Sequence, residues 1–245
     1  MTQIVTVITK DSIFMASDTR LNYNEEVEEN GEKYMIIKLV ADCYRKTFYL
    51  PKVKIGIQFL GIGFLKDKDK RYSLEHFLPK LEIGIKGTEG INFRMKKVFE
   101  NLKKITTIGN TSNFINGVMG GFYKNKPYIG TFNTFIKNGD LEIKKAQSGN
   151  LCDSEKILQN ISNKTEKCII KDIRNTIVSG SKRKPHLIGE EVEILKITQK
   201  KANYILKGKK LFSGTQEDLF NRLASDLLSL NGKLLNPIIK EKIIL

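Results

Sequence analysis

Apolar and polar residues alternate in two runs at the start of the chain, and a turn separates the runs. Residues 2–9 have the sequence Thr-Gln-Ile-Val-Thr-Val-Ile-Thr, and residues 12–17 form the second run after the turn at residues 10–11. Alternation with a period of two on both sides of a turn predicts two antiparallel strands. Because the second strand runs back along the first, we expect it to end with Asp18 beside Thr2.

The rest of the chain predicts groups of strands and helices in turn, with no internal repeat. Further strands are expected at residues 34–41, 45–50, 54–60, 116–123, 127–135, 141–147, 191–198 and 203–207. Helices are expected at residues 72–81, 90–104, 154–161, 165–179 and 216–230. The helix at 90–104 is expected to bury Phe93 and to expose Arg94. This order indicates an α+β fold in which two antiparallel sheets lie between two helical layers, a four-layer αββα sandwich.

Two segments stand apart from this order. Asn22–Lys33 is rich in Glu and Asn and is predicted to be a turn or mobile loop, so that residues 22–44 form a long loop of the main domain. The amphipathic helix at 216–230 follows the last predicted strand. We therefore expect one domain at residues 1–207 and a C-terminal helical extension at residues 208–245.

Composition narrows the function classes. No apolar run among the 245 residues approaches the roughly 18 residues of a membrane span, and the N-terminus has no signal-peptide pattern, so a cytoplasmic protein is expected. Three cysteines (Cys43, Cys152 and Cys168) without metal-type spacing indicate reduced thiols. With only two histidines, His76 and His186, neither a zinc site nor a histidine triad is expected. We expect no metal and no cofactor.

The net charge of +15 raises the question of nucleic-acid binding. The lysines are scattered along the chain, they outnumber the arginines, and no basic motif is interleaved with aromatic residues. Basic runs such as residues 182–184 and 207–210 are typical of solvated turns. Nucleic acid is therefore not an expected partner.

The threonine at position 2 is the first candidate for chemistry. Once Met1 is removed, Thr2 carries a nucleophile, its hydroxyl, and a base, its own α-amine. Such a residue needs an acid and a cation beside it, and Asp18 and Arg20 are placed to contribute. Each of these residues is commonplace alone, so only their conjunction supports catalysis.

Several motifs at matching spacing make a family resemblance specific. They are Met15-Ala16-Ser17-Asp18-Thr19-Arg20, in which Asp18 lies sixteen residues after Thr2; Lys46 at the start of a strand, before a strand that ends in Leu60-Gly61; the strand that contains Gly117, Gly120 and Gly121; Ser148-Gly149-Asn150; and Ser179-Gly180-Ser181. From Thr2 to about Lys207 the chain resembles a proteasome-type β-subunit, a member of the N-terminal nucleophile (Ntn) hydrolases. It is similar in style to the simple bacterial and archaeal members, in which no propeptide precedes the threonine.

The resemblance implies a threonine-type peptidase. The hydroxyl of Thr2 would attack a peptide carbonyl, Lys46 would accept or relay its proton, and Asp18 would orient the lysine and the amine. The carried-over catalytic set is Thr2, Asp18, Lys46, Ser148 and Ser179. A backbone N–H near Gly61 would stabilise the oxyanion.

The resemblance also implies partners: a polypeptide substrate, other copies of the chain in a ring, an unfoldase that could feed the ring, and no membrane. Strand positions Leu21, Tyr44 and Gln58 are expected near the substrate. One departure stands out, because the family usually has an aspartate three residues before its last serine, where this chain has Thr176. Asp172, about one helical turn earlier, could substitute only if the helix is a turn longer.

Two other functions remain open from the sequence. A related enzyme could pass the acyl group from Thr2 to an amine instead of water, and would then be a protein ligase or transpeptidase. The departure at Thr176 leaves open a non-catalytic scaffold subunit with the same fold.

Overall fold

The structure is a computed structural model, and it describes residues 3–60, 63–107, 115–134, 140–145, 149–150, 164–183, 188–208, 211–229 and 239–242. Helices and antiparallel sheets make up these residues, and every pairing between the named strands in them is antiparallel. The fold class is therefore α+β.

The first five-stranded sheet contains the N-terminal hairpin. Its strands, in spatial order, are β12 (Gly149–Asn150), β1 (Ile4–Ile8), β2 (Ile13–Asp18), β13 (Val192–Ile197) and β14 (Ala202–Leu206). The predicted return of β2 along β1 is confirmed, because Ile4 pairs with Ser17 and Ile8 with Ile13. The predicted closing hairpin is β13–β14.

The second five-stranded sheet is built from the middle of the chain. Its strands, in spatial order, are β11 (Asp140–Lys145), β10 (Lys126–Asn133), β9 (Asn116–Tyr123), β6 (Ile55–Leu60) and β5 (Thr47–Leu50). The sequence pattern predicts all five of these strands. A small two-stranded sheet, β7 (Phe64–Asp67) with β8 (Lys70–Ser73), follows β6.

The helices are η1 (Leu74–Phe77, 3₁₀), α1 (Leu78–Leu81), α2 (Ile91–Thr107), α3 (Glu166–Arg183) and α4 (Gln216–Ser229). The prediction of one helix at 72–81 is wrong at its start, because Tyr72 belongs to β8 and a 3₁₀ turn precedes α1. The predicted helix at 154–161 lies outside the described residues.

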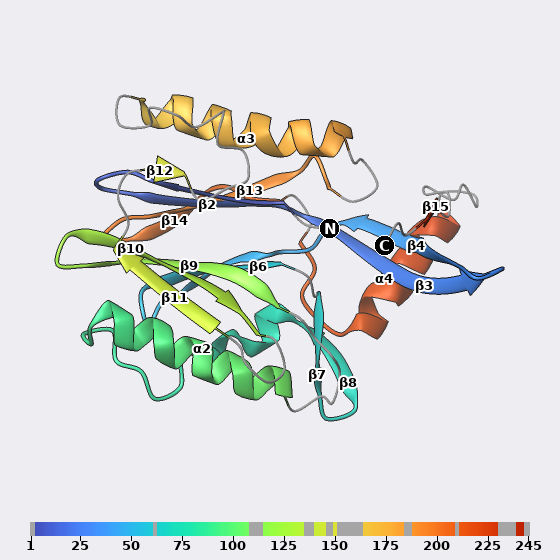
Figure 1. The fold of residues 1–245 in the computed structure, drawn as a ribbon, viewed down its shortest axis with the longest axis horizontal. Helices are drawn as coiled ribbons and strands as arrows, with labels where there is room; N and C mark the ends of the chain where they lie inside the picture. Colours follow the sequence, from blue (N-terminus) through green and yellow to red (C-terminus); the bar gives the residue numbers. More distant parts are fainter. Residues whose placement is uncertain are drawn as a thin grey trace.

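Figure 1 shows α3 over the first sheet and α2 under the second, with the two sheets facing each other between them. Buried side chains fill the three spaces. Val5 and Val7 of β1 pack in a cluster with Ile173 of α3, whereas Ile8 of the same strand packs with Ile129 of the opposite sheet. Both faces of β1 are therefore covered, and successive residues point to opposite faces because a strand has a period of two.

One face of α2 differs from its prediction. Phe93 is 50% exposed, whereas Arg94 is only 2% exposed. The guanidinium of Arg94 donates hydrogen bonds to the carbonyl oxygens of Val53 and Phe122, so it ties α2 to the second sheet. These backbone acceptors pair the two terminal nitrogens of a buried cation that the helical pattern alone places in solvent.

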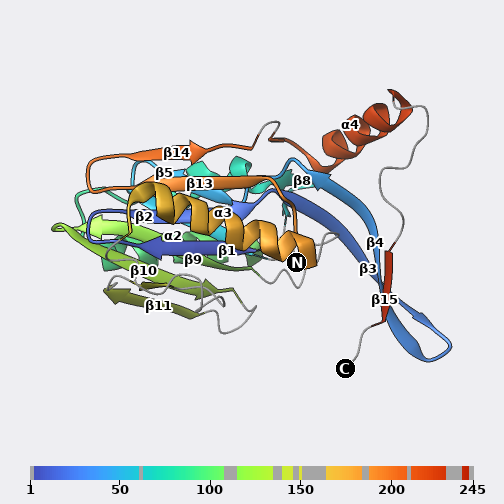
Figure 2. The same cartoon turned by 90° about the horizontal axis from the view of Figure 1, so that it is seen from above.

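The prediction of a loop at Asn22–Lys33 is wrong. β3 (Arg20–Glu29) and β4 (Glu32–Asp42) form a long antiparallel hairpin that projects from the body of the molecule (Figure 2). Its turn is Asn30–Gly31, where φ is +55° and +77°. An Asn-Gly pair suits a tight hairpin turn because both residues tolerate positive φ.

The C-terminal segment contacts the body in two places. Leu219 of α4 is fully buried in the core on the α2 side of the molecule, and β15 (Ile239–Lys242) pairs with β4 in a three-stranded sheet of order β15-β4-β3. Figure 2 shows α4 and β15 at the end of the molecule from which the hairpin projects. The predicted helix is confirmed, while β15 was not expected.

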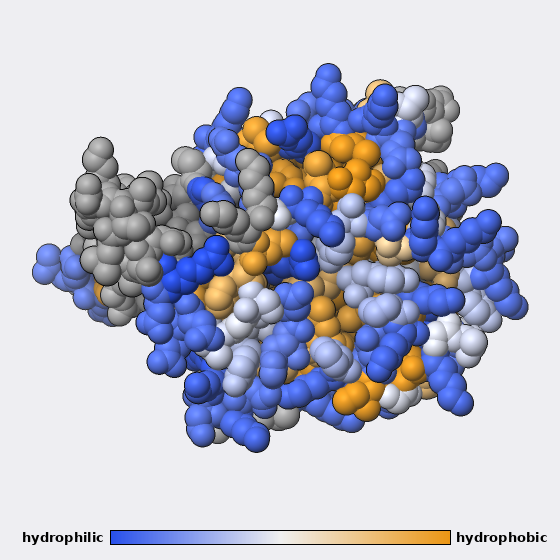
Figure 3. Space-filling model, turned by 180° about the vertical axis from the view of Figure 1, so that it is seen from behind, coloured by the Kyte–Doolittle hydropathy of each residue, from blue (hydrophilic) through white to orange (hydrophobic). Residues whose placement is uncertain are grey.

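The rear face of the molecule carries apolar patches set among hydrophilic side chains, as Figure 3 shows. Within the described residues, no helix combines the length and the apolar character needed to cross a membrane.

Candidate active site

Asp18 is the last residue of β2, and its fully buried carboxylate accepts hydrogen bonds from four donors. The backbone N–H of Gln3 donates to Oδ1 at 2.9 Å. The Nζ of Lys46 and the backbone N–H groups of Arg20 and Gly189 donate to Oδ2 at 2.9, 3.0 and 3.3 Å. The register of the β1–β2 hairpin places this carboxylate at the first residues of β1. The nitrogen of Gln3 belongs to the peptide bond that joins it to Thr2.

Lys46 immediately precedes β5, so it reaches Asp18 from the opposite sheet. The residue is only 5% exposed, and its carbonyl oxygen accepts a hydrogen bond from the N–H of Phe59 at 3.0 Å. Burial lowers the pKa of Lys46, and the nearby carboxylate of Asp18 opposes that shift only in part. The arrangement holds an amine that gives up its proton more readily than a lysine in water.

A buried polar network fixes the two sheets beside this ion pair. The hydroxyl of Thr47 donates to Ser17 Oγ at 2.9 Å, and the amide of Gln58 donates to Thr47 Oγ1 at 3.2 Å and to the carbonyl of Ala16 at 2.7 Å. The hydroxyl of Thr6 completes the network by donating to Gln58 Oε1 at 2.7 Å. Because these buried groups have partners, the network holds β2 and β5 in a defined relation.

A second charged group flanks Lys46. The Nε of Arg45 lies 3.2 Å from the fully buried carboxylate of Glu193, and its Nη1 lies 3.5 Å from Glu75. Burial raises the pKa of Glu193, and Arg45 counteracts this in part. The guanidinium also stacks over the ring of Tyr204, 4.9 Å from its centroid. Arg45 is therefore paired with Glu193 and Glu75, whereas Lys46 is paired with Asp18.

The last turns of α3 pack against the start of β1. The Nε2 of Gln3 lies 3.5 Å from the carbonyl oxygen of Thr176. Gly180 lies so close that a Cβ built there would be 1.9 Å from Gln3 Oε1. The helix therefore reaches the same end of β1 as Asp18 and Lys46.

Ser179-Gly180-Ser181 lies inside α3, which continues to Arg183, and the expectation that it follows the helix is wrong. Ser179 is exposed, whereas Gly180 and Ser181 belong to the buried face of the helix. The structure therefore does not bring Ser179 to Asp18 and Lys46. Ser181 is the serine on the buried face, and the helical period that includes Ile173, Thr176 and Ile177 is the signal that could have identified it.

Three candidate residues, Thr2, Ser148 and Gly61, lie outside the described residues. Thr176 is buried, and its hydroxyl donates to the carbonyl of Asp172 at 2.8 Å. Asp172 forms an ion pair of 2.7 Å with Lys164, although α3 is longer than predicted. Its carboxylate is therefore engaged away from the end of the helix that meets Gln3.

Two of the expected substrate-pocket residues are buried in the interior. Gln58 is fully buried in the network between the sheets, and Tyr44 is 1% exposed with its hydroxyl accepting a hydrogen bond from the N–H of Leu74. Neither side chain lines an open surface as expected from the sequence. Leu21 is half-buried.

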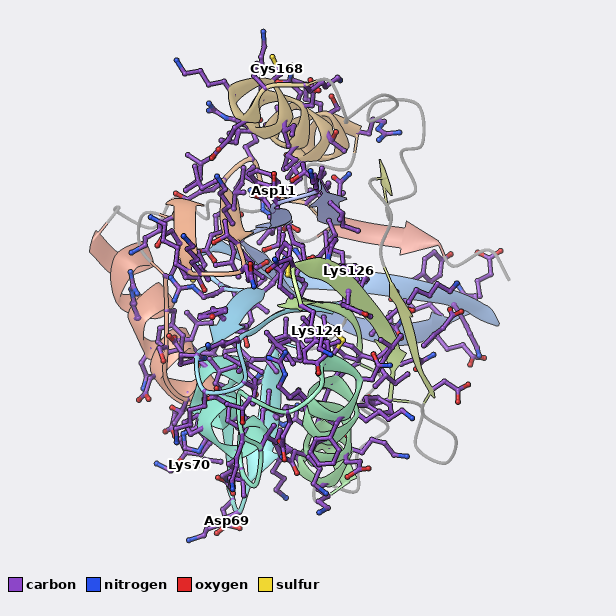
Figure 4. The ribbon with its side chains drawn as sticks, turned by 90° about the vertical axis from the view of Figure 1, so that its left-hand side faces the viewer. Asp11, Asp69, Lys70, Lys124, Lys126 and Cys168 are labelled. Atoms are coloured by element: carbon purple, nitrogen blue, oxygen red, sulfur yellow. The ribbon has the colours of Figure 1, made fainter. Side chains whose placement is uncertain are left out.

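Among the described residues, no group of three or more His, Cys, Asp or Glu side chains is arranged to hold a metal ion. Cys43 is buried and Cys168 is exposed, and Figure 4 shows Cys168 projecting outward from α3. Cys152 lies outside the described residues.

Comparison with known proteins adds no relative, because no family model and no curated protein matches the chain. The chemistry must therefore be inferred from the geometry. Lys46, whose pKa is lowered, and the N–H of Gln3, which precedes β1, are both hydrogen-bonded to the carboxylate of Asp18. Such a lysine can accept a proton from a hydroxyl at the start of the chain.

Proposed function

We propose that the protein is an N-terminal threonine hydrolase that cleaves peptide bonds through an acyl ester on Thr2 after removal of Met1. The observation that carries the proposal is the buried ion pair of Lys46 and Asp18, 2.9 Å apart. The same carboxylate accepts the N–H of Gln3, which is bonded to Thr2. Two residues chosen from the sequence for their chemistry are thus linked to the carboxylate of Asp18, Lys46 directly and Thr2 through its peptide bond to Gln3.

The proposed reaction proceeds in two steps. The hydroxyl oxygen of Thr2 attacks the substrate carbonyl carbon, and its proton passes to Lys46 directly or through the α-amine. The C–N bond of the substrate then breaks, the leaving amine takes the proton, and an ester remains on Thr2. Water adds to the ester, the C–O bond to Thr2 breaks, and the hydroxyl is restored. Thr suits this role because its methyl group restricts χ1 and helps to fix the attacking oxygen.

The order of layers supports the finer fold assignment. We propose that α3, the two five-stranded sheets and α2 form the four-layer αββα sandwich of the Ntn hydrolases, and that the chain is a proteasome-like member of that group. A cytoplasmic ring of identical subunits, with a polypeptide substrate and an unfoldase that could deliver it, belongs to the same proposal. Size-exclusion chromatography with light scattering tests the ring, since a mass near 28 kDa would contradict it.

The fate of the acyl group is the test of function. The native protein is incubated with short unstructured peptides of known sequence, with and without a small primary amine as acceptor, and the products are identified by mass spectrometry. Hydrolysis gives two fragments that together contain one added water. Transfer to the amine instead would replace the peptidase proposal by a ligase or transpeptidase. Absence of both products in the wild type would favour a non-catalytic scaffold, and equal products from Thr2→Ala would show that Thr2 is not the nucleophile.

A further inference from the structure

Gln3 has an unusual environment for the residue that follows a proposed nucleophile. Its backbone N–H is held by Asp18 Oδ1 at 2.9 Å, and its side-chain Nε2 is directed to the carbonyl of Thr176, 3.5 Å away. The residue is therefore attached to β2 through its backbone and to α3 through its side chain. These two contacts set the direction of the amide, with Nε2 toward the carbonyl oxygen of Thr176.

The other end of the same amide lacks a partner. Gln3 Oε1 is buried, and no described residue donates a hydrogen bond to it. Leaving a buried acceptor unpaired typically costs about 1–3 kcal/mol, so such an atom needs an explanation. The amide is not free to turn away, because Gly180 closes over Oε1 where any larger residue would clash.

The side of α3 that meets Gln3 is also where the resemblance leads us to expect a carboxylate, and the chain has Thr176 there. The hydroxyl of Thr176 is engaged with its own helix, donating to the carbonyl of Asp172. Asp172 itself is paired with Lys164. The side-chain amide oxygen of Gln3 is therefore an unpaired acceptor that lies between the start of β1 and α3.

We propose that Gln3 is a positioning residue whose Oε1 accepts a hydrogen bond from the α-amine of Thr2 and so takes over the task of a carboxylate at position 176. This inference rests on the proposed function, because it requires Met1 to be removed. The amide would hold the amine through one N–H and leave its lone pair to receive the proton of the Thr2 hydroxyl. The group donating to Oε1 lies one peptide unit away along the chain.

Several elements place charged groups near Gln3. Asp18 comes from β2 and Lys46 from the start of β5. Arg20, at the start of β3, is engaged by the carboxylate of Asp42. On α3, the exposed Arg183 donates to the carbonyl of Ser179. Glu191 lies 3.4 Å from the hydroxyl of Thr19, and the carboxylate of Asp18, which holds the N–H of Gln3, already has four donors.

The test measures the ionisation of the α-amine and not the activity. The native protein and its variants are labelled at a series of pH values with a limiting amount of acetic anhydride, and acetylation of the N-terminal peptide is quantified by mass spectrometry. Gln3→Met removes the acceptor while keeping the length of the side chain, and Gln3→Glu replaces it by a carboxylate. Gly180→Ala displaces the amide without changing Gln3, and Gln199→Leu, at an exposed turn, is the matched control.

The two substitutions at position 3 should move the midpoint of labelling in opposite directions. A hydrogen bond to the charged form raises a pKa, and a nearby opposite charge raises it further. We expect Gln3→Glu to raise the midpoint by about 1 pH unit or more, Gln3→Met and Gly180→Ala to lower it, and Gln199→Leu to leave it unchanged. If Gln3→Met does not fold, Gln3→Glu and Gly180→Ala still give the opposite shifts.

An unchanged midpoint in Gln3→Glu and Gly180→Ala would overturn the inference. Retention of Met1, seen in the mass of the N-terminal peptide, would overturn it together with the proposed function. Opposite shifts in a wild-type protein that cleaves no peptide would support the inference while the proposed function fails. Normal cleavage with unshifted midpoints would do the reverse.

Discussion

Lys46 Nζ lies 2.9 Å from Asp18 Oδ2, and both side chains are buried at the junction of the two sheets. A buried ion pair is costly to form, since both charges lose their hydration, and it is seldom kept for stability alone. Here the same carboxylate also holds the peptide N–H of Gln3, the residue that precedes β1. The pair therefore joins the two sheets at the point where the chain begins.

Breaking the pair from one side should destabilise the fold. Asp18→Asn leaves the ammonium of Lys46 buried without its counter-charge, and we expect a loss of about 3 kcal/mol in the free energy of unfolding. The double variant Asp18→Asn/Lys46→Met should regain most of this loss, because no unpaired charge remains. Urea denaturation of the two single variants and the double variant measures the coupling. Additive losses would show that the two side chains do not interact.

Replacement of Lys46 should abolish the reactivity of the proposed nucleophile. We expect Lys46→Met to slow acylation of Thr2 by a β-lactone about 10²–10⁴-fold, which is the usual contribution of a general base. Lys126→Ala is the control. Lys126 is the exposed first residue of β10, and Figure 4 shows it at the end of the molecule that also carries Asp11 of the β1–β2 turn. Equal rates in wild type and Lys46→Met would remove the lysine from the mechanism.

The lowered pKa of Lys46 should be visible in the pH dependence of stability. In the unfolded chain the lysine titrates near 10.5, and burial moves its pKa below that value in the fold. Between the two values the unfolded chain binds the proton and the folded chain does not, so the free energy of unfolding rises with pH. Below the folded pKa the penalty is constant. Urea midpoints measured from pH 7 to 10.5 should therefore rise more steeply in the wild type than in Lys46→Met. Parallel curves would contradict the shift.

Close contact between strands should make the stability of the fold sensitive to replacement of one glycine of β9, Gly117. A Cβ at Gly117 would lie 2.0 Å from the carbonyl oxygen of Gln58 on the neighbouring strand, and that backbone atom cannot yield cheaply. At Gly120 the nearest atoms are side-chain atoms at 3.2 Å or more. We expect Gly117→Ala to cost at least about 2 kcal/mol and Gly120→Ala clearly less. Thermal unfolding of the two variants compares them, and equal stability would contradict the packing at Gly117.

The sequence predicts the strands of both five-stranded sheets except the two-residue β12, because alternation and turn residues are local signals. The register of one hairpin predicts Asp18 at the start of β1, whereas Lys46 as its partner was predicted from the family resemblance, and the two side chains do form an ion pair. Most of β4 was predicted as a strand at residues 34–41, but β3 and the hairpin were missed because the glutamates of residues 22–33 suggested a loop, although Asn30–Gly31 is itself a strong hairpin turn signal. The prediction gave more weight to the many Glu and Asn residues of this segment than to its Asn30–Gly31 turn.

Two other predictions were wrong because they depend on contacts between residues that are far apart in sequence. Gly180 looks like the end of a helix, yet α3 continues through it because the missing side chain makes room for Gln3. Arg94 looks like a surface residue, yet the carbonyl groups of Val53 and Phe122 hold it inside. In each case the decisive partner is far away in sequence, so no local pattern contains it.

The mass of the N-terminal peptide after reaction with a β-lactone tests the central claim most directly. The hydroxyl of Thr2 would open the lactone and form an ester, which adds the full mass of the reagent. If Thr2 is the nucleophile, Met1 is absent from the native protein, the added mass maps to Thr2, and Thr2→Ala gains no mass. A retained Met1, or an adduct that persists in Thr2→Ala, would contradict it.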